Sequence, residues 1–439
     1  MYKYGGTSAN LQVPKVGAMY KIAMVSDFFH PRLGGVENHI LNVSRELRRL
    51  GHTVIVITHA NTGVSGIHYV DGFKTYYLEL LSIFGGAVFP TFVCTSFYIA
   101  EILLSEQVDI VHGHQCTPLG MESVFHAKML GLSTCFTNHS LVKVNTLGGV
   151  LTSSALQLSM ADTDQIICVS LASRNNTADR LEIPPERIKV IPNAVTDDFF
   201  PTTVRDTRTE IVISVVTRLT YRKGASLLAE VLPEICALGK QIRVVIAGDG
   251  DKRELLEQTV ELHNLKGQVD IIGGVDPSRV KDVLNNSDLF LNTSLTDAFC
   301  ITLIEAAACG LYVVSTNVDG IGEVLPKEMV TLTSTTPESI LRGIEEALPK
   351  IPKYNKALSH QRVKLLYQWP KIAKETERIY RSIVKPFKIP SPSKLGLSVK
   401  QMLCQRKDRI SMPFAAVLLV NYLVLLFLLA KHANRSSTP

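Results

Sequence analysis

The sequence contains no CxxC pair, no low-complexity tract and no apolar run near its start that would serve as a secretory signal peptide. Its eight cysteines are scattered and none clusters with histidine, which disfavours a zinc site or a disulfide framework and leaves reduced thiols as the expectation. With 46% hydrophobic and 20% charged residues the chain is not generally disordered, and 439 residues are enough for two globular domains.

The formal net charge of +6 is unevenly distributed. Residues 1–349 hold 28 basic and 37 acidic side chains, whereas residues 350–410 hold 16 basic and 3 acidic ones. An acidic body with a basic C-terminal segment argues against a nucleic-acid-binding protein and favours one localised anionic partner. An ordinary flank of a membrane span needs only a few cations, so we expect the longer basic segment to dock on anionic lipid.

Residues 412–430 carry no charge over 19 positions, which corresponds to about 29 Å of helix, close to the hydrocarbon thickness of a bilayer. A buried core helix is the alternative. More positive charges precede this run than follow it, so we predict a single transmembrane helix at 411–430, a cytosolic body and a lumenal tail at 431–439.

Short β-branched runs alternate with helical segments, which is typical of parallel α/β architecture. The strands that we expect lie at 21–26, 53–58, 108–112, 134–137, 165–169 and 188–191, and then at 211–216, 241–247, 269–273, 288–292 and 311–315. We predict two Rossmann-like domains that face a cleft, 1–207 and 208–368. A helix at 369–384 and a proline-containing linker fill the segment 369–410.

Glycines follow two of these expected strands, although a GxGxxG dinucleotide fingerprint is absent. Gly34 and Gly35 directly precede a helix, where the backbone can approach a ligand and the helix N-terminus can bind an anion. A plain turn between strand and helix is the alternative. Gly248, Asp249 and Gly250 line the carboxyl end of the strand at 241–247.

Charged residues follow two other strands of the second series. Arg218 leaves the carboxyl end of one strand, where open parallel sheets bind ligands, and Lys223 lies where the next helix begins. This pair suits a diphosphate, with two solvated surface cations as the alternative. Asp297 lies at a helix entrance, where an N-cap is the alternative, whereas Glu305 lies in the apolar run ITLIEAAACG and needs a partner.

Taken together, these features resemble the retaining glycosyltransferases of family GT4, which have the GT-B fold. The runs MVSDFFHPRLGGVENHI, FTNHSL, LTYRKG and FLNTSLTDAFC further resemble the PIG-A family, the catalytic subunits of phosphatidylinositol N-acetylglucosaminyltransferase. Enzymes of this family make the first intermediate of the glycosylphosphatidylinositol anchor and carry one C-terminal membrane span. The resemblance covers about residues 20–370.

The resemblance implies a role for each matching residue. Arg218 and Lys223 would hold the UDP diphosphate, and Glu305 would accept hydrogen bonds from the ribose. Asp297 would contact the sugar hydroxyls, and His139 would lie near the transferred sugar, unless it only caps a strand at the surface. The remaining substrate-binding residues would be Gly34, Gly35, Gly248, Asp249, Ser294, Phe299 and Cys300.

The chain departs from the family pattern at two positions. Asp297 replaces the usual glutamate and has about 1.5 Å less reach, and Asn138 stands before His139 where the family has aspartate.

The implied reaction transfers N-acetylglucosamine from UDP-GlcNAc to phosphatidylinositol with retention of configuration. It requires no protein nucleophile, no metal and no other cofactor. The setting would be the endoplasmic reticulum membrane, within a multisubunit complex. Two alternatives remain open: another lipid-directed GT4 enzyme, such as a mannosyltransferase using GDP-mannose, and a catalytically inactive scaffold of the same fold.

Overall fold

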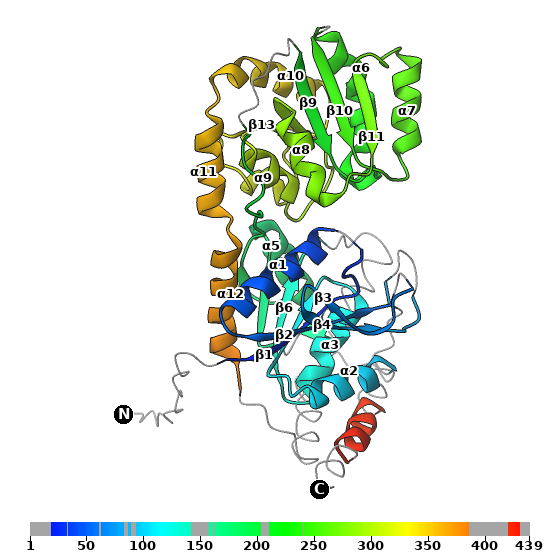
Figure 1. Ribbon diagram of the computed structural model, residues 1–439, viewed down its shortest axis with the longest axis vertical. Helices are drawn as coiled ribbons and strands as arrows, with labels where there is room; N and C mark the ends of the chain where they lie inside the picture. The colour runs from blue at the N-terminus through cyan, green and yellow to red at the C-terminus, as the bar shows by residue number, and fades with distance from the viewer. Residues whose placement is uncertain are drawn as a thin grey trace, which may run out of the picture.

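Two β-sheets with helices on their faces lie one above the other along the long axis of the computed structural model (Figure 1). The structure describes residues 19–32, 34–60, 63–82, 87–88, 94–141, 157, 159–160, 163–202, 210–239, 241–385 and 420–430. The two expected α/β units are therefore present. The predicted boundary between residues 207 and 208 lies outside the described residues and stays a prediction.

The first sheet has eight strands in the order β3-β4-β2-β1-β5-β6-β7-β8. Their bounds are β1 Lys21–Val25, β2 Thr53–His59, β3 Gly66–Val70, β4 Phe73–Leu78, β5 Ile110–His114, β6 Ser133–Asn138, β7 Gln165–Cys168 and β8 Ile188–Val190. All neighbours pair in parallel except β3 and β4. Neither strand of this hairpin was predicted: β3 is an edge strand with mostly exposed residues and lacks an apolar run, whereas β4 is mostly buried and its run FKTYYL was missed.

The second sheet has six parallel strands in the order β11-β10-β9-β12-β13-β14. Their bounds are β9 Ile211–Val216, β10 Ile242–Ala247, β11 Val269–Gly273, β12 Leu289–Asn292, β13 Tyr312–Thr316 and β14 Val330–Thr333. Five of these strands match the expected positions. The edge strand β14 was not predicted, since its sequence VTLT alternates with threonine and lacks an apolar run, and only two of its residues are buried.

Helices cover the faces of both sheets (Figure 1). Those of the first unit are α1 Gly35–Arg49, α2 Cys94–Ser105, α3 Pro118–Met129 and α5 Leu171–Leu181. Those of the second unit are α6 Ala225–Ala237, α7 Arg253–Leu262, α8 Val280–Asn285, α9 Ile301–Ala308 and α10 Pro337–Ala347.

Two C-terminal helices connect the units along one side of the molecule (Figure 1). α11 Lys356–Leu366 packs against α9, and α12 Trp369–Ile383 crosses back to pack against α1. One face of α12 is apolar and buried, including Trp369 and Tyr380. The predicted helix at 369–384 is confirmed, and its return to the first unit ties the two units together.

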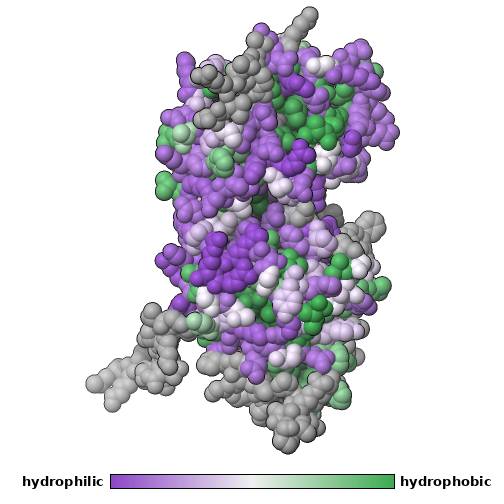
Figure 2. All heavy atoms as spheres, viewed as in Figure 1, coloured by the Kyte–Doolittle hydropathy of each residue, from purple (hydrophilic) through white to green (hydrophobic). Residues whose placement is uncertain are grey.

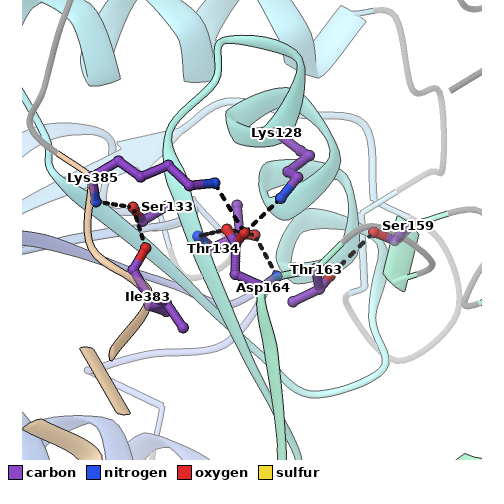
Figure 3. Close-up of polar contacts among 8 residues, drawn as sticks. All are labelled: Lys128, Ser133, Thr134, Ser159, Thr163, Asp164, Ile383 and Lys385. Carbon is purple, nitrogen blue, oxygen red and sulfur yellow. Dashed lines mark hydrogen bonds and ion pairs between the residues drawn. The ribbon is translucent and has the colours of Figure 1, made fainter. Parts of the chain in front are cut away.

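Lys385, which follows α12, is hydrogen-bonded to residues of the first unit, as Figure 3 shows. The backbone N–H of Lys385 donates to Ser133 Oγ at 2.8 Å, and Lys385 Nζ lies 3.2 Å from Asp164 Oδ1. Asp164 also accepts from Lys128 Nζ at 2.7 Å and from the backbone N–H of Thr134 at 2.9 Å. Part of the basic segment thus serves the fold itself.

Residues 420–430 form a helix that lies beside α2 (Figure 1). Leu425, Leu428 and Leu429 are buried in one apolar cluster with residues of α2 and α3, such as Leu103 and Phe125. Within the described part of the chain, no helix has both the length and the apolar character needed to cross a membrane. The predicted span at 411–430 is described only from residue 420 onward.

The six cysteines that the structure describes fully are free, which agrees with the expected reduced thiols: Cys116, Cys135, Cys168, Cys236, Cys300 and Cys309. The face drawn in Figure 2 is mostly hydrophilic, with smaller apolar areas.

Candidate functional site

The loop after β9 brings two cations to the carboxyl edge of the second sheet. β9 ends at Val216, a short 3₁₀ turn covers Tyr221–Lys223, and α6 follows Gly224. Gly224 has φ +72°, and a Cβ there would lie 1.8 Å from the carbonyl oxygen of Thr293, so only glycine fits. The backbone of this loop is therefore tied to the loop that follows β12.

From this position the side chain of Lys223 forms an ion pair with Asp297. Its Nζ lies 2.5 Å from Asp297 Oδ2, with side-chain exposures of 23% and 13%. Burial alone lowers the pKa of Lys223, but the Asp297 carboxylate outweighs that effect and the pKa is raised. Asp297 does not cap α9, whose N-cap residue is Cys300. Its Oδ1 accepts from the backbone N–H of Phe299 at 3.3 Å.

Arg218 has a different environment. It is exposed, and no hydrogen bond or ion pair engages its side chain within the described ranges. It is close enough to Lys223 and Glu37 to influence the pKa of each. The structure thus brings Arg218 and Lys223 together as predicted, with one guanidinium left free for an anion.

Gly248 and Gly250, which follow β10, let this loop approach the loop after β9 closely. A Cβ on Gly248 would lie 1.7 Å from the carbonyl oxygen of Thr217, and one on Gly250 would lie 2.3 Å from that of Leu219. Asp249 accepts from the N–H of Gly250 and pairs with Arg253 at 3.5 Å, and its side chain is 61% exposed. The two glycines therefore shape the edge of the sheet, while Asp249 faces solvent.

Glu305 lies on α9, one turn beyond Ile301 on the same side of the helix. Burial, followed by the nearby Asp198 carboxylate, raises the pKa of Glu305 to about 7. No hydrogen bond engages its carboxylate in the part of the chain that the structure describes. An acceptor of this kind, held on a rigid helix, suits ligand hydroxyls.

The start of α9 contains the other residues that the sequence singled out. Ser294 is buried and donates to Asn292 Oδ1 at 2.8 Å. Phe299 and Cys300 are buried, and burial raises the pKa of the Cys300 thiol to about 12. These three residues thus support the loop, and the Cys300 side chain stays a neutral thiol.

The N-terminus of α1 faces this loop from the first unit. A Cβ on Gly35 would lie 3.2 Å from Ile301 Cδ1, so the starts of α1 and α9 almost touch. A Cβ on Gly34 would lie 2.5 Å from Glu37 Oε2. Burial raises the pKa of Glu37, although Arg32 and Arg218 lower it. The sequence alone did not single out Glu37, whose carboxylate lies against Gly34.

His139 follows β6 at the edge of the first sheet and is partly buried. It is not a surface cap but part of a cluster of histidines. Its Nε2 lies 3.2 Å from His114 Nδ1, and its ring lies 4.6 Å from that of His39. The ring of His114 in turn lies 4.1 Å from that of His112, at a tilt of 31°. The HxH pattern at 112–114 was the sequence signal for this cluster.

Three of these histidines, His39, His114 and His139, hold nitrogens within 4.8 Å of one another, as a metal site would. The His114 and His139 centroids are 5.5 Å apart, while their facing nitrogens are 3.2 Å apart. The distance between the ring centres exceeds the distance between the nitrogens by about the width of one ring. Both nitrogens therefore lie on the line that joins the two ring centres. That is the geometry of an N–H···N hydrogen bond rather than of two lone pairs aimed at one ion.

Solved structures share this architecture. Sucrose-phosphate synthase from Thermosynechococcus elongatus aligns with a TM-score of 0.69 at 19% identity, covering 82% of this chain and 98% of that one. Anabaena HepE in complex with UDP aligns with a TM-score of 0.66 at 15% identity, covering 83% and 100%. Residues 33–199 match the model of Glycosyltransferase Family 4, and residues 197–361 match that of Glycosyl transferases group 1. Fold and site therefore define a two-domain glycosyltransferase of the GT-B type.

Relatives with higher identity narrow this class. The phosphatidylinositol N-acetylglucosaminyltransferase subunit from Arabidopsis thaliana is 45% identical over 83% of this chain and 82% of its own length. The subunit of the same name from Homo sapiens is 38% identical over 96% and 89%, and the gpi3 subunit from Schizosaccharomyces pombe is 40% identical over 82% and 80%. The chain belongs to the family of these phosphatidylinositol N-acetylglucosaminyltransferase subunits, the PIG-A family.

Proposed function

We propose that this chain transfers N-acetylglucosamine from UDP-GlcNAc to phosphatidylinositol with retention of configuration, the first step of glycosylphosphatidylinositol anchor synthesis. One observation carries the proposal: Arg218 and Lys223 lie close together after β9, and the start of α1 almost touches Ile301 of α9, one helical turn before Glu305. Two cations and one free carboxylate are the groups that a diphosphate and a ribose require. The names of the 38–45% identical relatives support the choice of substrates.

In this proposal Arg218 and Lys223 offset the negative charge that develops on the departing UDP. Two cations at the carboxyl edge of the sheet can perform this task without a metal ion. Asp297 keeps Lys223 charged and in place, because the carboxylate raises the pKa of that lysine. Glu305 accepts hydrogen bonds from the ribose hydroxyls, and His139 faces the transferred sugar from the other unit.

The proposal includes a place at the endoplasmic reticulum membrane, with a cytosolic body and a span at 411–430. Several cations of the basic segment already have partners in the fold, including Arg362 with Glu328 and Lys385 with Asp164. Exposed lysines and arginines of α12 remain for anionic lipid: Lys371, Lys374 and Arg378. Each cation near such a surface contributes about 1 kcal/mol. The relatives are named as subunits, which supports assembly with further subunits.

Binding and transfer assays test the proposal. Purified full-length chain should be protected against thermal unfolding by UDP-GlcNAc and UDP, and membranes containing the complex should transfer labelled N-acetylglucosamine to phosphatidylinositol. Protection by GDP-mannose instead would indicate a mannosyltransferase. Nucleotide binding without transfer, in the presence of all partner subunits, would indicate an inactive scaffold. Truncation before residue 411 should release the chain from membranes at high salt, and continued retention would contradict the predicted span.

A further inference from the structure

Three side chains form a line that leads from the core of the first unit to the carboxyl edge of its sheet. Met24 Sδ on β1 lies 3.4 Å from His114 Nε2 on β5. His114 Nδ1 lies 3.2 Å from Nε2 of His139. Met24 and His114 are fully buried, whereas His139 is partly exposed at the edge of the sheet. The interior end of the line is therefore closed to water, and only its outer end can meet a ligand.

The sulfur atom sets the direction of both hydrogen bonds. A thioether can only accept a hydrogen bond, so the His114 Nε2 that faces it carries the hydrogen. Nδ1 of a neutral His114 is then an acceptor, and Nε2 of His139 must supply the hydrogen between the two rings. Nδ1 of His139 is left with its lone pair. The opposite arrangement would place the lone pair of His114 Nε2 against the sulfur, where no hydrogen is available to either atom.

Both histidines are neutral near physiological pH. Burial, and then the surrounding histidines, lower the pKa of His114 and of His139 well below the ordinary value. On the other side of the cluster, His39 Nδ1 lies 2.8 Å from Asn193 Oδ1, and the His39 ring meets His139 edge to face. The His139 ring is thus fixed both by a hydrogen bond and by packing.

We propose that Met24 and His114 are positioning residues that fix the tautomer of His139, so that His139 Nδ1 accepts a hydrogen bond from a hydroxyl of the transferred sugar. This inference rests on the proposed function for the identity of the ligand. Nδ1 of His139 has no hydrogen-bond partner among the residues that the structure describes. An acceptor locked in one tautomer orients a hydroxyl without switching between donor and acceptor roles.

Nitrogen NMR of the full-length chain labelled with ¹⁵N-histidine tests the tautomer directly, whether or not the chain binds UDP-GlcNAc. The His139 signals are those lost in His139→Asn, and we expect protonated Nε2 and unprotonated Nδ1. Met24→Leu keeps the volume but removes the sulfur, and His114→Phe removes the acceptor. Both should give a mixture of tautomers at His139. If the His114→Phe variant does not fold, the Met24→Leu variant alone still tests the proposal.

His112→Asn is the matched control. His112 is as buried as His114, but its nitrogens face Tyr380 Oη at 2.6 Å and Thr137 Oγ1 at 2.7 Å instead of His139. This variant should leave His139 in the same single tautomer as in the wild type, although its signals shift because the His112 ring packs 4.1 Å from that of His114. A protonated Nδ1 in the wild-type chain, or unchanged His139 signals in Met24→Leu, would overturn the proposal.

A second measurement separates positioning from a general structural effect. Met24→Leu should weaken the binding of UDP-GlcNAc about three- to tenfold and leave that of UDP unchanged, because UDP lacks the sugar. An equal loss for both nucleotides would overturn the positioning role. If the wild-type chain binds neither nucleotide, the proposed function fails, while the NMR result still decides whether Met24 and His114 fix the tautomer.

Discussion

Lys223 Nζ lies 2.5 Å from Oδ2 of Asp297, and this ion pair joins the loop after β9 to the loop before α9. A second link runs parallel to it, since the backbone N–H of Leu295 donates to the carbonyl of Arg222 at 3.0 Å. Asp297 therefore holds the ammonium of Lys223 between these two loops.

Replacement of the two cations tests the diphosphate assignment. Arg218→Ala should lower the rate of transfer at least 10²-fold. Removal of a group that stabilises the charge developing in the transition state typically lowers an enzyme's rate about 10²–10³-fold. Its melting temperature should not change, since Arg218 is exposed and forms no ion pair within the described residues. Lys223→Ala should lower the rate similarly. Rates of transfer like those of the wild type in either variant would contradict the assignment.

Substitutions of Asp297 distinguish an enzyme from an inactive scaffold. Asp297→Asn removes the charge that raises the pKa of Lys223 and should lower the rate about 10²-fold. Asp297→Glu keeps the charge and should retain transfer within about tenfold of the wild type. Activity that appears only in Asp297→Glu would show that the natural chain is catalytically inactive. Transfer assays of the three proteins side by side, with equal amounts of folded protein, provide the comparison.

The sequence was sufficient for the parallel strands at the centre of both sheets, although not for β3, β4 and β14. It also located Arg218 and Lys223 after β9, because parallel strands end at one edge and ligand-binding residues follow them. It could not assign Lys223 to Asp297, which is 74 residues away. The histidine cluster was also missed, since His39, His114 and His139 come from three separate elements. Such pairings depend on side-chain geometry between strands, which periodicity does not contain.

Gly248 is expected to be intolerant of any side chain. Its Cβ would overlap the backbone carbonyl oxygen of Thr217 at 1.7 Å, so Gly248→Ala must displace a loop of the site. We expect a loss of about 1–3 kcal/mol in the free energy of unfolding, together with weaker nucleotide binding. Gly267→Ala is the matched control, because no atom lies within 4 Å of a Cβ at that position. Urea unfolding of both variants measures the difference, and equal stability would contradict the close approach.

The burial of the Glu305 carboxyl makes the free energy of unfolding depend on pH. The pKa of this carboxyl is 4.5 in its ordinary state and about 7 in the folded protein, mainly because of burial. Between these values the folded protein binds a proton that the unfolded chain does not. The free energy of unfolding therefore falls as the pH rises through this interval, and the loss is complete above pH 7.

Glu305→Gln removes the ionisable group and should be more stable than the wild type by about 1–3 kcal/mol at pH 8, with no such gain near pH 4.5. The same variant should bind UDP about tenfold more weakly, because a charged acceptor for the ribose hydroxyls is lost. Glu230→Gln, at an exposed position of α6, is the control and should change neither quantity. Thermal unfolding at the two pH values and UDP titration measure both effects. A gain of equal size at both pH values would show that the stabilisation does not arise from the charge of Glu305. An unchanged affinity for UDP would contradict the proposed contact between Glu305 and the ribose.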